Sequence, residues 1–164
     1  NDRGKGNTAE IDPQLTQIPK EYFDVIRQSC LESLNVGPVE GYPMTDVHIT
    51  VVGGDFIEES ANEVAYKIAA SIATRDGCRK ANPLMLEPVF SVEVVAPEEH
   101  IGDVIADLSS RRGRIEGIQQ HQSTQAVEAI VPLAQMFGYV TMLRSITQGR
   151  GSYTMKFYGY DIKI

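Results

Sequence analysis

The first half of the chain contains segments in which apolar residues recur with the spacing of regular secondary structure. Residues 19–37 carry an apolar side chain every three or four positions, which predicts a helix with one packed face. The residues of that face are Phe23, Ile26, Cys30 and Leu34. Residues 46–52 alternate between apolar and polar side chains, which predicts a half-buried strand. Residues 1–10, rich in glycine, asparagine and charge, are expected to form a loop.

A second helix is expected over residues 60–80. Ser60 and Glu63 have the spacing of a capping box, in which each side chain binds an unpaired backbone amide of the first turn. The large apolar residues of this helix share one side, and they are Val64, Ile68 and Ile72. Prolines at 83 and 88 bracket a short extended segment beyond the helix. We therefore expect two small domains, over residues 1–87 and 88–164.

The second half alternates strand and helix patterns. The expected elements are a strand at 89–96, a helix from Pro97 to Gly113, strands from Arg114 and at 124–132, a helix from Pro132 and a strand at 151–160. The first of these helices turns Ile101, Val104, Ile105 and Leu108 inward. Right-handed crossovers fold this order into a four-stranded antiparallel sheet with both helices on one face. The sequence thus predicts an α+β protein whose second domain is a ferredoxin-like βαββαβ sandwich.

Composition and charge exclude several classes of function. Across 164 residues, 15 Lys and Arg face 22 Asp and Glu, and the net charge of −7 argues against nonspecific coating of nucleic acid. No apolar run reaches the roughly 18 residues of a membrane span, and the first residues lack the apolar core of a signal peptide. Cys30 and Cys78 are expected to be free thiols in a reducing cytoplasm.

No recognisable catalytic or metal-binding pattern is present. His48, His100 and His121 share no metal-ligand spacing, and no Ser-His-Asp or Cys-His set has a supporting signature. The glycine-rich phosphate loop of many nucleotide-binding proteins is also missing. We expect no metal, no cofactor and no catalytic residue in this chain.

Positive charge is concentrated where the helix from Pro97 ends. Arg111, Arg112 and Arg114 surround Gly113, and Arg150 lies between two glycines at the end of the other helix. Cations offset the dipole at a helix C-terminus, but this effect explains only Arg111 and Arg112. Assuming that both helices run in the same direction, all four arginines lie at one end of the domain. The pattern favours a phosphate- or RNA-binding edge, because arginine presents a planar fork to phosphate.

Two other functions remain open on this pattern. Residues 150–157 partly fit a motif of RRM domains, which stack RNA bases on aromatic side chains of the open sheet face. The candidate aromatics are Tyr153, Phe157 and Tyr158, although packing against a neighbouring domain is an alternative role for them. A standalone ferredoxin-like module that binds a small ligand is the second possibility.

Three long segments carry a resemblance to a known family. They are "CRKANPLMLEPVFSVEVVAPEE" (78–99), "DVIADLSSRRGRIEGI" (103–118) and "VPLAQMFGYVTMLRSITQGRGSYTMKF" (131–157). Together they resemble the C-terminal half of translation elongation factor G, from Ile18 to about Tyr158. The resemblance implies that residues 1–87 are the latter part of domain IV, a partial ribosomal protein S5 domain 2-like fold. Residues 88–164 would be domain V.

The resemblance also implies a function and partners. Members of the family hydrolyse GTP with Mg²⁺ in an N-terminal domain, so this chain is expected to be a non-enzymatic fragment. Its partners would be ribosomal RNA and, at the decoding region, tRNA and mRNA, and the protein would be a monomer that assists translocation. Arg111, Arg112, Arg114 and Arg150 are the candidates for contact with ribosomal RNA.

The tip of domain IV departs from the family pattern. The matching residues are Gly53, Gly54, Asp55, Phe56 and Ile57. Ile57 stands where family members commonly carry a histidine, and the segment is more acidic. A paralogue specialised for ribosome recycling or ribosome protection is therefore an alternative to a translocating factor.

Overall fold

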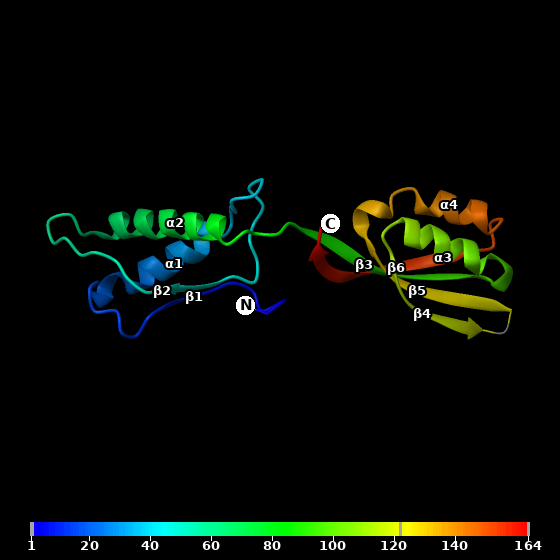
Figure 1. Cartoon of the computed structure of the whole chain (residues 1–164), viewed down its shortest axis with the longest axis horizontal. Helices are drawn as coiled ribbons and strands as arrows, with labels where there is room; N and C mark the ends of the chain where they lie inside the picture. Colours follow the sequence, from blue (N-terminus) through cyan, green and yellow to red (C-terminus); the bar gives the residue numbers. More distant parts are fainter. Residues whose placement is uncertain (1, 122, 164) are drawn as a thin grey trace. The chain divides into compact units, whose positions relative to one another are not determined.

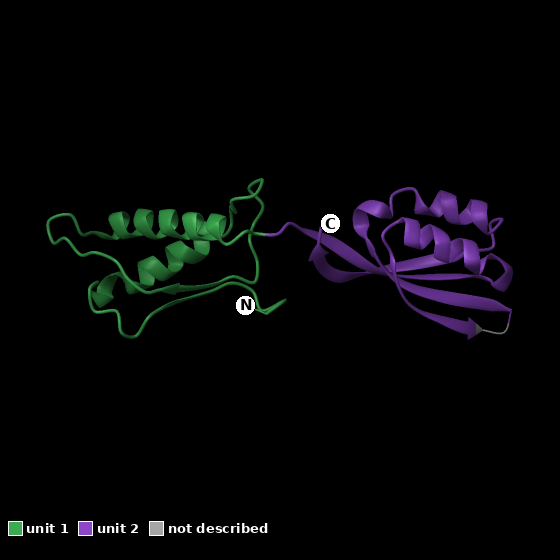
Figure 2. Cartoon of the chain, in the orientation of Figure 1, with its two compact units in different colours: residues 1–83 green, residues 84–164 purple. Residues whose placement is uncertain are grey.

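The computed structural model describes residues 2–121 and 123–163, and the chain divides into two compact units, 1–83 and 84–164 (Figure 2). This division falls a few residues before the boundary expected from the sequence. Strand β3 (Leu86–Pro97) begins before Pro88 and already pairs with β6 (Ser152–Ile162) at Leu86, so the segment between the two prolines belongs partly to the second unit.

Unit 1 contains a two-stranded parallel sheet of β1 (Thr8–Ile11) and β2 (His48–Val51) (Figure 1). The prediction of a loop over residues 1–10 is wrong from Thr8 onward, where β1 begins. The Asp46 carboxylate accepts hydrogen bonds from the Gly4 and Gly6 amides at 3.0 and 2.8 Å, which holds the N-terminal segment beside β2. These contacts join positions far apart in the sequence, so local periodicity does not reveal them.

Two helices complete unit 1. The first, α1 (Phe23–Ser33), follows the short 3-10 helix η1 (Lys20–Tyr22) and is shorter than the helix expected over 19–37. It ends early because the following residues form a turn, in which the Gly37 amide donates to the Tyr42 carbonyl. The second, α2 (Glu63–Lys80), has its N-terminus capped by Asn62 and not by Ser60, because Asn62 Oδ1 accepts from the Ala65 amide at 2.8 Å.

The helices of unit 1 pack through small residues. The buried positions of α2 are Ala70, Thr74 and Cys78, whereas Val64, Ile68 and Ile72 are 66%, 55% and 56% exposed. Ser29 in α1 donates a hydrogen bond of 2.7 Å to the Lys67 carbonyl, which is possible because the two helices lie close together. The periodic apolar side of α2 is therefore the side turned to solvent, and the small side chains face α1.

Unit 2 has the predicted ferredoxin-like fold. Its elements after β3 are α3 (Ile101–Ser110), β4 (Arg114–His121), β5 (Thr124–Pro132), α4 (Tyr139–Ile146) and β6. The strands lie in the order β4-β5-β3-β6, and every neighbouring pair is antiparallel. Both helices cover the same face of the sheet (Figure 1).

The core of unit 2 lies between the sheet and the two helices. Alternate residues of β3 and β5 point into it, and α3 contributes Ile101, Val104 and Leu108 as predicted. Helix α4 begins at Tyr139 instead of Pro132, because the short 3-10 helix η3 (Leu133–Gln135) and Gly138, with φ of 74°, precede it. Tyr139 and Leu143 are the buried residues of α4.

Candidate nucleic-acid interface

The arginine-rich turn, residues 111–114, begins where α3 ends. Backbone amides of this turn donate hydrogen bonds to the last carbonyls of the helix. Arg112 takes a left-handed conformation with φ of 61°, and the Gly113 amide donates to the Leu108 carbonyl at 2.9 Å. A Cβ atom on Gly113 would lie 2.5 Å from that same carbonyl oxygen. Glycine is therefore required here for close backbone approach, and this tight turn sets the directions of the arginines on either side.

Arg111 is a structural residue in this unit. Its side chain is only 16% exposed and binds Asp107 within α3 at 2.8 Å. Its Nη1 atom donates a hydrogen bond to the Gln135 carbonyl, and the guanidinium lies 5.1 Å from the centre of the Tyr139 ring. These contacts link the end of α3 to the start of α4, and they leave little of Arg111 for a ligand.

Arg112 and Arg114 each form an ion pair with a glutamate, and the two pairs differ in how far their side chains are buried. Arg112 binds Glu87 of β3, whose side chain is largely buried, at 2.5 Å. Arg114 binds Glu116 at 2.6 Å, and both side chains are substantially exposed. The Glu116 carboxylate raises the pKa of the Arg114 guanidinium through this hydrogen bond and its charge, with Asp161 and Tyr158 as further neighbours. Of the three arginines in the turn, Arg114 is the one most accessible to a phosphate.

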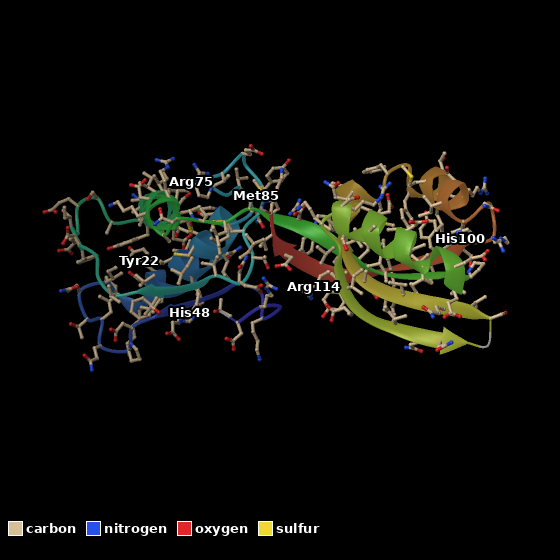
Figure 3. All side chains as sticks on the ribbon, turned by 45° about the vertical axis from the view of Figure 1, so that its right-hand side comes forward. Tyr22, His48, Arg75, Met85, His100 and Arg114 are labelled. Carbon is tan, nitrogen blue, oxygen red and sulfur yellow. The ribbon has the colours of Figure 1, made fainter. Side chains whose placement is uncertain are left out.

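Arg150 lies at the other end of unit 2, so the prediction that all four arginines share one end is wrong. The antiparallel strand order forces α3 and α4 to run in opposite directions. Arg150, after α4, binds Glu99 and His100, which precede α3, at 2.5 and 2.7 Å. Figure 3 shows His100 and Arg114 at opposite ends of the unit. Arg150 holds the pKa of the Glu99 carboxyl below its usual range, first through the hydrogen bond and then through its charge.

The candidate tip residues of unit 1 lie in the loop that joins β2 to α2. Because β1 and β2 are parallel, the segments that follow them leave the sheet at the same end. A Cβ on Gly54 would lie 2.6 Å from the Ile18 side chain, so the loop touches the segment that follows β1. Phe56 and Ile57 are exposed, and the Tyr66 hydroxyl donates to the Asp55 carbonyl at 3.1 Å.

The RRM-like arrangement of aromatics is not present. Tyr153 turns toward the helices and packs edge-on against Tyr139, with ring centres 5.0 Å apart. The opposite face of the sheet carries Glu93 directly across from Glu128, which suits an anionic ligand poorly. Phe157 and Tyr158 are exposed in the second half of β6, where Phe157 lies opposite Phe90 and packs against Tyr160.

The described part of the chain lacks other obvious sites. No group of three or more His, Cys, Asp or Glu that could hold a metal ion occurs among residues 2–121 and 123–163. His121 falls where only the backbone is described. Cys30 and Cys78 are buried free thiols. In the same described ranges, no helix combines the length and apolar character needed to cross a membrane.

Comparisons with known proteins match both units. Residues 1–82 match the family model described as "Elongation factor G, domain IV", and residues 84–163 match the one described as "Elongation factor G C-terminus". A crystal structure of a protein from Thermus thermophilus is similar, with a TM-score of 0.81 and 34% sequence identity. The match covers 97% of this chain and 24% of that protein, so the chain spans about a quarter of that relative's length.

Proposed function

Because the chain belongs to the elongation factor G family, we propose that it is the ribosome-binding C-terminal portion of a translational GTPase. The resemblance seen in the sequence is confirmed, and the observation that carries the proposal is the match of two successive family models to the two units. Neither matched model is a GTPase domain. We therefore assign GTP and Mg²⁺ to a part of the parent protein outside these residues, and we propose a monomer that acts in the cytoplasm.

The exposed Arg114 supports contact with ribosomal RNA. An ion pair between exposed side chains such as Arg114 and Glu116 contributes about 0–1 kcal/mol, so a phosphate can replace the glutamate at little cost. Arg112 is held by the largely buried Glu87 and is less free to exchange. Arg150 provides a second cation at the opposite end of the unit. We assign Arg114 as the main RNA contact of the turn.

Cosedimentation of the 164-residue chain with ribosomes tests this proposal. We expect binding that weakens as salt rises, because phosphate contacts release counterions. Arg114→Ala should weaken binding and lower the salt dependence by about one unit of slope. Glu116→Gln should strengthen binding, because it removes the competing carboxylate. Arg27→Ala removes an exposed arginine with a similar ion pair in unit 1 and serves as the matched control.

The result that would overturn the proposal is a chain that stays in the supernatant at low salt. Equal losses for Arg114→Ala and Arg27→Ala would keep ribosome binding but remove Arg114 from its special role.

The tip of unit 1 favours a second candidate function within the same family. Ile57 is exposed in the loop, and Asp55, Glu58 and Glu59 surround it with negative charge. This acidic loop has no imidazole that could contact tRNA or mRNA. We take this as favouring a paralogue that recycles or protects ribosomes. A translocation assay on the full-length parent decides between the two: efficient translocation by the natural sequence, unaffected by Ile57→His, would exclude the specialised role.

A further inference from the structure

The outer face of the two-stranded sheet in unit 1 carries four polar side chains that contact one another. Thr8 pairs with His48 in the parallel register, and Glu10 pairs with Thr50 two positions further along. These four residues are exposed, whereas the alternate residues of both strands pack on the hydrophobic cluster of unit 1. Figure 1 shows α1 and α2 on the same side of the strands, so the polar face is the one turned to solvent. We propose that this face binds a zinc ion through Glu10, His48 and Thr50.

The three proposed ligand atoms form a triangle with nearly equal sides, which we call the ligand triangle. Glu10 Oε1 lies 3.2 Å from His48 Nε2, and Thr50 Oγ1 lies 3.3 Å from each of these two atoms. Zinc binds nitrogen and oxygen at about 2.0–2.2 Å with tetrahedral geometry, and two such ligands are then about 3.4 Å apart. A zinc ion can therefore contact all three atoms after small side-chain movements, with a water molecule as its fourth ligand.

Thr8 supports the form of the histidine that metal binding needs. His48 Nδ1 lies 2.7 Å from Thr8 Oγ1, and this hydroxyl can accept a hydrogen bond from a proton on Nδ1. In that tautomer, Nε2 carries a lone pair and faces the other two ligand atoms. Metal-binding histidines usually donate their second ring N–H to a neighbouring oxygen in this way.

The chemistry of the ligands selects zinc over magnesium or calcium. Magnesium and calcium prefer six or more oxygen ligands, whereas imidazole nitrogen suits zinc, copper and nickel. Glu10 supplies a negative charge and His48 supplies the nitrogen. Their side chains are 61% and 40% exposed, so an ion can reach both of them from solvent.

A bound ion would join the two strands of unit 1. Glu10 belongs to β1, whereas His48 and Thr50 belong to β2. An ion that binds only the paired strands stabilises them increasingly as its concentration rises. Sequence spacing does not reveal this site, because Glu10 and His48 are 38 positions apart and the third ligand is a hydroxyl.

Isothermal titration calorimetry of the 164-residue chain with zinc chloride, and with magnesium chloride at the same concentrations, tests the proposal. Zinc should bind and magnesium should give no heat of binding. His48→Ala, Glu10→Gln and Thr50→Val should each weaken zinc binding at least about tenfold, the lower limit for loss of a group that supports a metal ligand. His100→Gln is the matched control, because His100 also lies near a glutamate, Glu99 at 3.5 Å, but an arginine nitrogen already contacts its Nε2.

The imidazole nitrogens of His48 give a second readout by NMR. Zinc should shift the Nε2 resonance of His48 and leave Nδ1 protonated, which binding elsewhere on the acidic surface would not do. The urea midpoint of unit 1 should rise with zinc concentration, while that of unit 2 stays constant.

Zinc binding that is absent, unchanged in His48→Ala and Glu10→Gln, or equally reduced in His100→Gln would overturn the proposal. Circular dichroism of each variant shows whether unit 1 remains folded. Glu10→Gln changes one exposed side chain without changing its length, so this variant and the His48 resonances keep the test decisive if His48→Ala unfolds. Ribosome cosedimentation is measured separately, so the zinc proposal can fail while the proposed function stands.

Discussion

At the scale of single residues, the arginines that look equivalent in the sequence have different roles. Arg111 forms its hydrogen bonds inside unit 2, and Arg112 is held by a largely buried glutamate. The side chain of Arg114, in contrast, is 61% exposed. The spacing around Gly113 does not distinguish these cases, because Arg111 also binds the Gln135 carbonyl and Arg112 binds Glu87, and both of these partners lie far away in the sequence. Only the contact between Arg111 and Asp107, four positions apart on one helix, is of the kind that sequence spacing predicts.

Gly113 and Gly102 provide a contrast between two glycines of the same region. Gly113→Ala should destabilise unit 2 by roughly 1–3 kcal/mol, because its Cβ would meet the Leu108 carbonyl at 2.5 Å and the backbone must shift. Gly102→Ala should stabilise the unit by up to about 1 kcal/mol, because this helical position has open space and alanine favours helix. Urea unfolding measures both changes. Equal effects of the two substitutions would contradict the steric role of Gly113.

The ion pair at the opposite end of unit 2 predicts a pH effect. Arg150 lowers the pKa of the Glu99 carboxyl in the folded state, so the pair stabilises the fold above the usual glutamate range. This stabilisation is lost as the pH falls through the lowered pKa. In Arg150→Ala, the pKa of Glu99 should rise toward its ordinary value in an NMR titration of the carboxyl carbon. Glu32, whose pKa is lowered by Gln28 and Lys67, should not change.

At the scale of elements, the helix α2 shows what apolar periodicity reveals and what it omits. Val64, Ile68 and Ile72 correctly indicate a helix, but they lie on its exposed side. The side that packs on α1 contains Ala70 and Thr74, because small side chains let two helices approach closely. The spacing of apolar residues indicates that a helix forms. Which face of the helix is buried depends on the element that packs against it. In α3 the two coincide, since its large apolar residues face the sheet.

The start of α2 provides a direct test at this scale. Asn62→Ala should lower the free energy of unfolding by about 1 kcal/mol, because it removes the bond to the Ala65 amide. Ser60→Ala should change it by less than about 0.5 kcal/mol, as is usual for surface substitutions. Ser60 is the residue that the capping-box spacing favours, so urea unfolding of the two variants separates the sequence-based assignment from the observed one. A larger loss for Ser60→Ala would reverse this conclusion.

At the scale of the whole molecule, the order of elements in unit 2 was predictable and the placement of its charges was not. The alternation of strands and helices leads to a four-stranded sheet, and the structure has it. The error lay in the direction of the helices, because an antiparallel order of β4-β5-β3-β6 requires α3 and α4 to oppose each other. The arginine candidates therefore lie at two ends of the unit, with Arg150 beside Glu99 and His100.

The two units should differ in their ability to fold alone. Unit 2 encloses a continuous core between four strands and two helices, including Val92, Val127, Leu108 and Tyr139. Among its described residues, 2–83, unit 1 has two paired strands and leaves large apolar residues of α2 exposed, and two-stranded sheets are marginal in water. Residues 84–164 expressed alone should therefore unfold cooperatively in urea, with a midpoint equal to that of unit 2 in the 164-residue chain.

Residues 1–83 alone should unfold with a broad transition and bind the dye ANS, which reports exposed apolar surface in loosely packed states. The comparison is informative because the two pieces have similar lengths, so chain length cannot account for a difference between them. A sharp transition and no dye binding for residues 1–83 would mean that the small buried cluster of Leu15, Ile26 and Cys30 is sufficient. The exposed side of α2 would then be a stable surface of unit 1 in its own right.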